Sequence, residues 1–440
     1  MLRGGWRWLG LVLAVVLVVV GVWVVRDRRK MNHALRRTQL AEKQDVVEHV
    51  VADVPDAPPP KEDPGLAARL AALGYTDGLV EADDGPTSVT IHKPGRTDGG
   101  WNFYTVGGRS SAMLVDMDGR EVWRWDVTLK DVWPDFSGDH ASEIASWRRA
   151  LLLPGGDVIG VWSDYGIARV DRYGRVRWAH FMPVHHDLEL LPDGGVVTLV
   201  HEPRRVKKIN PRDEVFEDFL VWLGPDGAEQ RRISVLKAFA DHPDFPKIWG
   251  GRGGGDVIDP FHTNSVQVVD ERLVYEGGPF KSGQILTSMR NISTVAVIDP
   301  ETEAVVWYLR GDFRSQHDPR IVGPNEILVF DNRGLGKRSR VLAYDTRTGR
   351  PGWSYTGTEA APFYTIDCGH AQRLANGNTL INESASGRAF EVEPDGKIVW
   401  EYRSPYRVED DDGKGQMIAR FYEFRRVSPD TDMSWMVRPE

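Results

Sequence analysis

Residues 115–123, VDMDGREVW, contain the pattern that decides the fold. An acidic turn residue and a glycine precede a short β-type run that ends in tryptophan, and an Asp-Gly pair is a strong signal for a tight hairpin turn. Further copies occur at 170–178 (VDRYGRVRW), 298–307 (IDP leading to VVW), 344–353 (YDT leading to Trp353), 392–400 (VEPDGKIVW) and, in a weaker form, 223–227 (LGPDG). Six copies predict six structural units.

A second type of hairpin alternates with the first. It occurs at 152–159 (LLPGGDVI), 190–197 (LLPDGGVV), 322–329 (VGPNEILV) and 374–381 (LANGNTLI). Two hairpins per unit and a repeat of roughly 50 residues predict four-stranded blades, and therefore an all-β fold, a six-bladed β-propeller. A parallel solenoid is the alternative, but it would need shorter and more uniform repeats. We expect the segment after Trp400, including 421–427, to supply the strand that closes the ring beside the first blade.

Composition agrees with many short strands. The 440 residues include 45 glycines, 27 prolines and 16 tryptophans, a turn-rich and aromatic-rich mixture. The formal net charge of −9 argues against a nucleic-acid partner, because binding phosphates needs a basic face. Cys368 is the only cysteine, which excludes an internal disulfide and a cysteine-based metal cluster.

The N-terminal segment predicts a membrane anchor within residues 1–30. Residues 9–25 are 17 consecutive uncharged residues, with tryptophans before them and a basic cluster after them. This length spans a bilayer, and no small-residue cleavage site follows it. A buried core helix is the alternative. The basic cluster after Val25 favours a cytoplasmic main domain.

The rest of the chain divides into a spacer and one large domain. Residues 31–85 are a proline-rich linker with a short helix expected at 65–73, where leucines recur at helical spacing. We assign 86–440 to the propeller. The sequence does not indicate an oligomeric state.

Aligning the second hairpins on their turns places four histidines at equivalent positions. They are His186, His262, His317 and His370, and in the preceding blade the same position falls on Arg148. All five come just before the hairpin expected to be innermost in its blade, so we expect their side chains to converge on the propeller axis. A cluster of titratable groups in a channel is typical of a functional site.

Two other interpretations of the histidines stay open. One histidine per repeat could be a structural device that recurs because the blades are copies. A metal centre is the second, since imidazoles bind zinc, copper or iron. No spacing is diagnostic of a metal, and arginine and asparagine accompany the histidines, so we expect neither a metal nor another cofactor.

Five sequence strings, taken in order and spacing, resemble the arylsulfotransferase (aryl-sulfate sulfotransferase) family. They are HHD at 185–187, FHTNS at 261–265, LTSMR at 286–290, QHD at 316–318 followed by LVFDN at 328–332, and QRLANGNTL at 372–380. The resemblance covers roughly residues 85–430. It implies transfer of a sulfuryl group from a phenolic sulfate donor to a phenol acceptor, without a nucleotide sulfate, through a sulfated histidine.

The resemblance also implies roles for individual residues. His317 matches the nucleophile, Arg290 the family's arginine, and His186 its remaining histidine. His262 and Asn264 match a histidine and asparagine pair. The expected catalytic residues are therefore His317, His262, Arg290 and His186, and the expected substrate-binding residues are Asn264, His185, His370 and Arg148.

Two further functions compete with sulfuryl transfer. One is a membrane-tethered binding or assembly propeller whose histidines recognise a ligand that is not transformed, and the other is a metal-dependent lyase or hydrolase. The resemblance implies a single-pass protein of the cytoplasmic membrane, held by residues 9–25, with its domain on the extracytoplasmic side. This orientation is opposite to the one that the basic cluster favours.

Overall fold

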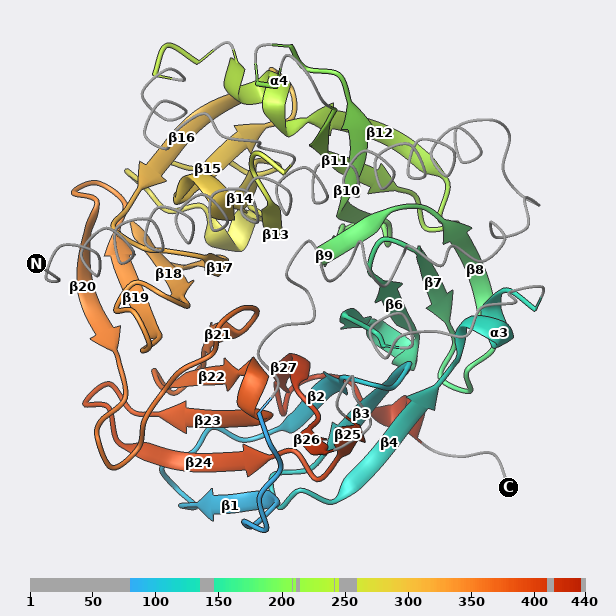
Figure 1. The fold of residues 1–440 in the computed structure, drawn as a ribbon, viewed down its shortest axis with the longest axis vertical. Helices are drawn as coiled ribbons and strands as arrows, with labels where there is room; N and C mark the ends of the chain where they lie inside the picture. The colour runs from blue at the N-terminus through green and yellow to red at the C-terminus, as the bar shows by residue number, and fades with distance from the viewer. Residues whose placement is uncertain are drawn as a thin grey trace, which may run out of the picture.

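The computed structural model describes residues 80–134, 146–207, 209–210, 214–240, 242–244, 259–409 and 415–436. Six antiparallel sheets surround a central axis, and the innermost strands lie closest to it (Figure 1). The predicted six-bladed β-propeller is therefore confirmed. The expected anchor at 9–25, the helix at 65–73 and the linker up to residue 79 lie outside the described residues. Within the described part, no helix is long and apolar enough to cross a membrane.

Each blade is listed from its innermost strand outward. Blade 1 is β27 (Phe421–Val427), β2 (Trp101–Val106), β3 (Ser111–Val115) and β4 (Glu121–Asp126). Blade 2 is β5 (Arg149–Leu152), β6 (Val158–Trp162), β7 (Gly166–Val170) and β8 (Val176–Phe181). Blade 3 is β9 (Val184–Leu190), β10 (Val196–Arg204), β11 (Val215–Leu223) and β12 (Glu229–Ser234).

The second half of the ring follows the same plan. Blade 4 is β13 (Thr263–Val268), β14 (Ile285–Met289), β15 (Thr294–Asp299) and β16 (Ala304–Arg310). Blade 5 is β17 (Gln316–Gly323), β18 (Glu326–Asp331), β19 (Arg340–Asp345) and β20 (Arg350–Tyr355). Blade 6 is β21 (His370–Arg373), β22 (Thr379–Glu383), β23 (Arg388–Val392), β24 (Ile398–Arg403) and β1 (Ser88–His92).

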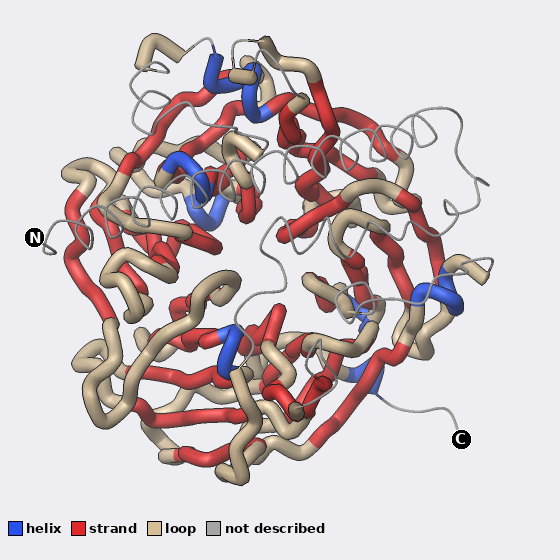
Figure 2. The backbone as a smooth tube through the Cα atoms, viewed as in Figure 1, coloured by secondary structure: helices blue, strands red, loops and turns tan. Residues whose placement is uncertain are grey.

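Connections contain the remaining short elements, and helices are few (Figure 2). They are α3 (Leu129–Val132), α4 (Val235–Ala240), the hairpin of β25 (Arg407–Glu409) and β26 (Gln416–Ile418), and the 3-10 helices η1 (Pro154–Gly156), η2 (Glu271–Leu273), η3 (Arg290–Ile292), η4 (Ser384–Ser386) and η5 (Ser434–Met436).

Both ends of the described chain close the ring. As predicted, the segment after Trp400 supplies the closing strand, because β27 pairs with β2 along its length. A second closure was not predicted: β1 pairs with β24 and makes blade 6 five-stranded. The first blade and the last blade are therefore each completed by a strand from the opposite end of the chain, so strand pairing closes the ring.

The tryptophan that ends four of the sequence repeats joins neighbouring blades. Trp123 Nε1 donates to the backbone carbonyl of Arg172, in the corresponding turn of blade 2, at 3.0 Å. The same contact recurs from Trp178 to Pro225, from Trp353 to Pro394 and from Trp400 to Met117. In the weaker copy, Arg231 takes the place of the tryptophan and donates to the carbonyl of Pro300. The repeated turn and the repeated tryptophan are thus two halves of one interblade contact.

Candidate active site

Three of the innermost strands begin with a bulge. Strand pairing passes directly from Leu188 to His185 in β9, from Thr263 to Val266 in β13 and from His317 to Arg320 in β17. The residues skipped in these three strands are His186 and Asp187, Asn264 and Ser265, and Asp318 and Pro319. A bulge changes the direction in which side chains point, and bulges are frequent beside active sites.

The backbone at these strand starts adopts an unusual conformation. His186, His262, Asp318 and Cys368 have φ angles of 59°, 50°, 45° and 52°, in the left-handed region that side chains other than glycine disfavour. Such a residue costs on the order of 1–3 kcal/mol, and residues of this kind cluster at functional sites. The repeated strain around one axis agrees with a site there.

A cavity of about 50 Å³ lies where the strand starts converge. It is lined by Arg148, Arg149, His186, Asp187, Asn264, His317, Asp318, Cys368, Gly369, His370 and Tyr422. Five of the eight predicted site residues are therefore on its wall. The other three, His262, Arg290 and His185, are not among the lining residues.

The orientation of the His317 ring is fixed from behind. Its Nδ1 lies 2.7 Å from Asn332 Oδ1 and 2.9 Å from the carbonyl oxygen of Ser315. The Asn332 amide in turn donates to the carbonyls of Cys368 at 2.7 Å and Thr365 at 3.2 Å, so its oxygen must face His317. Both partners of Nδ1 are acceptors, and Nδ1 therefore carries the proton. The lone pair of the neutral ring is on Nε2.

Burial keeps this ring neutral. The pKa of His317 is lowered to about 4, first by burial and then by the charge of Arg290, while the Asn332 hydrogen bond opposes the change. Burial contributes more to this shift than the charge of Arg290. Arg290 is placed beside the site by its backbone N–H, which donates to the carbonyl of His262 at 3.2 Å.

His262 is oriented by a carboxylate that the sequence analysis did not identify. Its Nδ1 lies 2.5 Å from Asp259 Oδ2, and its backbone N–H donates to Asp259 Oδ1 at 3.0 Å. Burial raises the pKa of Asp259, but its interactions with His262 outweigh burial and lower the pKa to about 2. The His262 ring contacts the cavity wall through His186, with ring centroids 4.9 Å apart at 74°.

His185 lies behind His186 and does not line the cavity. The Nδ1 atoms of the two rings are 2.8 Å apart, a hydrogen bond between imidazoles. The other face of His185 stacks on His201, with centroids 4.3 Å apart at 24°. His185 is 1% exposed, so a role in contacting substrate, one of the predicted options, does not fit its position.

Arg148 and Asn264 do lie on the wall, as expected. The Arg148 guanidinium is 4.4 Å from the centroid of the Tyr422 ring, a cation–π contact. Asn264 Nδ2 donates to the carbonyl of Gln316 at 2.8 Å, and Asn264 Oδ1 has no hydrogen-bond partner among the described residues. Tyr422 comes from the closing strand and was not predicted as a site residue.

His370 occupies a different position from the one expected. Strand pairing in three blades shows which residues correspond. The residue three positions after the start of the second strand is Val161 in β6, Leu199 in β10 and Asn382 in β22. Their partners on the innermost strands are Arg149, His185 and His370. His370 therefore corresponds to His185, and not to His186. Its Nε2 lies 2.5 Å from the carbonyl oxygen of Phe424 on β27, which joins blade 6 to the closing strand. Burial, then Arg425, lowers the pKa of His370 to about 4.

A closed ring of alternating charges, which we call the charged ring, forms part of the cavity wall. In order it contains Arg149, Asp187, Arg320, Asp318, Arg425 and Glu423, and Glu423 contacts Arg149 again. Apart from the short Glu423–Arg149 contact, the nitrogen–oxygen distances around the charged ring are, in the same order, 2.8, 3.0, 2.6, 3.1 and 2.7 Å. Its three cations balance its three anions, so the charged ring adds no net charge beside His317. Its residues come from four blades, which it joins.

His185, His201 and Asp218 form a buried group whose nitrogen and oxygen atoms lie within 4.8 Å of one another, close enough to consider a metal ion. The near-parallel stacking of the two rings does not suit one, because the nitrogen lone pairs lie in the ring planes and do not converge on a single point. We therefore predict no stoichiometric metal. Elemental analysis of purified protein checks this, and about one zinc per chain would contradict it.

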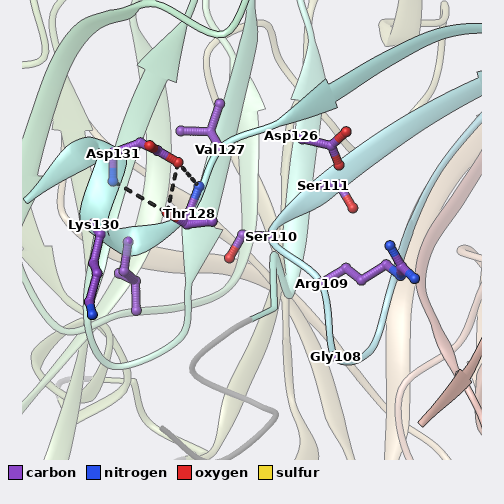
Figure 3. A pocket seen from close by; sticks show the side chains of 10 residues that line it. Gly108, Arg109, Ser110, Ser111, Asp126, Val127, Thr128, Lys130 and Asp131 are labelled. Carbon is purple, nitrogen blue, oxygen red and sulfur yellow. Dashed lines mark hydrogen bonds between the residues drawn. The ribbon is translucent and has the colours of Figure 1, made fainter. Parts of the chain in front are cut away.

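A larger pocket of about 590 Å³ lies beside the β2–β3 turn, the end of β4 and α3 (Figure 3). Two of its polar groups cap α3. Thr128 and Asp131 form the capping box of α3, in which Asp131 Oδ2 accepts from Thr128 N and Oγ1, each at 2.7 Å. No histidine lines this pocket, so it does not offer the chemistry of the central cavity.

The fold and the cavity define the class of protein: a β-propeller whose axial site brings together buried histidines, His317 among them, and arginines. The sequence matches the profile of the Arylsulfotransferase (ASST) family over residues 149–405, which is more than half of the chain. The chain belongs to this family, and membership supports a sulfotransferase-type enzyme.

Comparison with solved structures gives distant similarities. A Bacteroides caccae protein of unknown function is 12% identical and covers 73% of this chain and 97% of its own, with a TM-score of 0.47. Moraxella catarrhalis BamB is 12% identical, covers 76% and 85%, and has a TM-score of 0.33. Staphylococcus aureus virginiamycin B lyase is 11% identical, covers 58% and 69%, and has a TM-score of 0.32. No match was found among curated proteins.

Proposed function

We propose that this protein transfers a sulfuryl group from an aryl sulfate to a phenol through a sulfohistidine at His317, without a nucleotide sulfate. The observation that carries the proposal is the fixed tautomer of His317. Two acceptors hold its Nδ1 proton, so the nucleophilic lone pair is on Nε2 of a residue that lines the cavity. A neutral, oriented nitrogen of this kind can attack sulfur.

The reaction has two halves. In the first, His317 Nε2 forms a bond to sulfur, the bond between sulfur and the aryl oxygen breaks, and the electron pair leaves with the phenolate, which then takes a proton. In the second, the oxygen of the acceptor phenol attacks the same sulfur, the N–S bond breaks, and a base takes the phenol proton. The asparagine and carbonyl behind Nδ1 stabilise the imidazolium character that develops on His317.

The cationic residues suit a substrate with a sulfate group. Arg148 lines the cavity, and Arg290 lies close enough to affect the pKa of His317. Arginine presents a planar fork of donors that can hold sulfate oxygens in the transition state. Asn264 Oδ1 can accept from the hydroxyl of the acceptor phenol, since it has no other partner in the described part of the chain. His186 and His262 are the candidates for proton transfer.

Incubation of the purified protein with 4-nitrophenyl sulfate and a panel of phenols tests the proposal. We expect release of nitrophenol that depends on the acceptor, together with a sulfated acceptor detectable by mass spectrometry. Addition of a nucleotide sulfate should not be needed. Release of inorganic sulfate at a rate unaffected by any phenol would contradict group transfer and indicate hydrolysis.

The pH dependence of the first half-reaction is a further prediction. Because burial lowers the pKa of His317 to about 4, the ring is neutral above this pH and protonated below it. The acid limb of kcat/KM should therefore lie near pH 4, and not near the ordinary histidine value of about 6.5. Measuring kcat/KM for the donor from pH 3.5 to 8 checks this. An acid limb at pH 6–7 would show that a different group controls attack.

Replacing Arg290 separates the two causes of the low pKa of His317, which are burial and the charge of the arginine. In Arg290→Met the smaller contribution to the low pKa is lost, but the burial of His317 stays. The acid limb should move only slightly toward higher pH. A shift to the ordinary histidine value would show that the arginine, and not burial, dominates.

A further inference from the structure

A chain of three groups, His186, His185 and Asp218, leads away from the cavity, and its last two members are buried. The Nδ1 atoms of His186 and His185 are 2.8 Å apart. On the far side of the second ring, His185 Nε2 faces Asp218 Oδ1 at 3.7 Å. Neither His185 Nε2 nor Asp218 Oδ1 has a hydrogen-bond partner among the described residues. Two buried polar atoms that face each other without other partners need an explanation.

We propose that His186, His185 and Asp218 form a proton relay, in which Asp218 stores the proton that the two half-reactions exchange. The inference rests on the proposed function and names the residues that move its proton. His186 is the group that touches the substrate oxygen, whereas His185 and Asp218 act through it.

The hydrogen bond between the two rings couples their tautomers. Burial keeps both neutral, since it lowers the pKa of His185 and of His186 well below the ordinary value. Of two neutral imidazoles joined through their Nδ1 atoms, only one can donate. If His185 donates, then His186 has its proton on Nε2 and is an acid toward the cavity. If His186 donates, then His186 Nε2 has a lone pair and is a base.

Asp218 selects between these two states. When its carboxyl is protonated it can donate to His185 Nε2, which makes His186 an acid. When it is ionised it can accept from His185 Nε2, which makes His186 a base. At 3.7 Å the pair must close by about 0.8 Å to form this bond. Burial raises the pKa of Asp218 well above its usual range, so both forms are accessible.

Each transfer balances in atoms and charge. As the donor's aryl oxygen leaves, His186 Nε2 gives it a proton, His185 Nδ1 passes its proton to His186 Nδ1, and Asp218 passes its proton to His185 Nε2. Asp218 becomes a carboxylate and both rings stay neutral. When the acceptor phenol attacks, the three protons move in the opposite direction, and Asp218 is protonated again.

Other charged groups surround the relay and must be considered in any measurement against pH. Those that affect His185 are His201, Asp164, His262 and Asp259. Those that affect Asp218 are Asp259 and Glu217, and Thr263 donates its backbone N–H to Asp218 Oδ2 at 2.8 Å. Asp259 is the main competitor, because it forms a similar pair with His262.

The decisive variant is Asp218→Asn in the full chain, since the amide keeps the shape but cannot exchange the proton. Nitrophenolate is a good leaving group and needs no acid, so with 4-nitrophenyl sulfate the initial burst of nitrophenol should persist. Turnover with a phenol acceptor should fall by roughly a hundredfold or more. With unsubstituted phenyl sulfate as donor, the burst should slow as well.

Asp164→Asn is the matched control. Asp164 is a buried carboxylate paired with His201, next to the relay but outside it, and asparagine tolerates its φ of 64°. This variant should keep both burst and turnover. The relay is refuted if Asp218→Asn slows the burst and turnover equally, if Asp164→Asn has the same effect as Asp218→Asn, or if only Asp259→Asn keeps the burst and loses turnover.

A measurement without substrate separates the relay from the proposed function. Nitrogen NMR of histidine-labelled wild-type protein should show His186 Nε2 change from N–H to lone-pair character as pH rises, together with the opposite change, from lone pair to N–H, at His185 Nε2. In Asp218→Asn the switch should be absent. Absence of the switch in wild type overturns the relay, whereas a switch without any transfer from aryl sulfates overturns the proposed function only.

Discussion

His317→Ala should reduce sulfuryl transfer to the background rate. The variant removes the cavity-lining imidazole whose Nδ1 proton is held by two acceptors, Asn332 and Ser315, and whose lone pair is therefore on Nε2. Enzymes that lose their nucleophile lose on the order of 10⁶ in kcat, and we expect a loss limited by the sensitivity of the assay. The measurement is acceptor sulfation from 4-nitrophenyl sulfate, together with circular dichroism to show that the propeller is intact.

His92→Ala is the control for this variant. His92 is on β1, the outermost strand of blade 6, and its ring contacts Asp118 at the surface. Three strands separate β1 from the innermost strand of the blade. Its replacement should leave transfer unchanged. A folded His317→Ala protein that still transfers sulfate would refute the assignment and direct attention to His262 or His186.

Of the variants proposed, Arg320→Met should lose the most stability. Arg320 is the hub of the charged ring, with Asp318 at 2.6 Å, Asp187 at 3.0 Å and Glu189 at 3.0 Å, and its side chain is 8% exposed. Methionine keeps much of the volume but leaves these carboxylates without their shared cation. Removing one partner of a buried ion pair costs about 3–5 kcal/mol. Thermal unfolding followed by circular dichroism should show a clearly lower melting temperature.

The loss of stability in Arg320→Met should depend on pH. Burial raises the pKa of Asp318, but Arg320 and Arg425 outweigh burial and hold the pKa well below the usual range, so the pair stabilises the fold at neutral pH and loses this effect as pH falls. In Arg320→Met the remaining carboxylates can take up protons more easily. The difference in melting temperature between the variant and the wild type should therefore become smaller toward pH 4.

Arg347→Met provides the comparison, because Arg347 pairs with Asp345 at the surface. An exposed pair contributes little, so this variant should melt like wild type. Equal melting temperatures for the Arg320 and Arg347 variants would show that the charged ring does not hold the blades together.

Local patterns predicted the fold because each repeat carries its own turn and most repeats carry the side chain of an interblade contact. The Asp-Gly turns recur with Gly119 at φ 83° and Gly396 at φ 85°, a conformation that glycine adopts easily. Strand β1 was missed for the opposite reason. It is half-buried, belongs to no repeat, and pairs with a strand more than 300 residues away, which no local pattern reveals.

The candidate site was predicted only in part, because strand pairing decides which side chains reach the axis. Counting from the turns placed His370 with His186, but the bulge in β9 moves the register, and pairing matches His370 to His185. The groups behind the imidazoles come from elsewhere in the chain. Asn332 follows β18, and Asp218 is a buried acid inside the apolar strand β11, a signal that the sequence analysis did not use.

The most direct test of the account is to find the covalent intermediate. Protein treated with an aryl sulfate donor, without acceptor, should be digested at neutral or alkaline pH, because the N–S bond is labile in acid, and analysed by mass spectrometry. The account predicts a sulfuryl increment on the peptide that contains His317, lost on adding a phenol and absent from His317→Ala. An increment on a peptide that contains His186 or His262 instead, or none on any peptide while transfer proceeds, would contradict it.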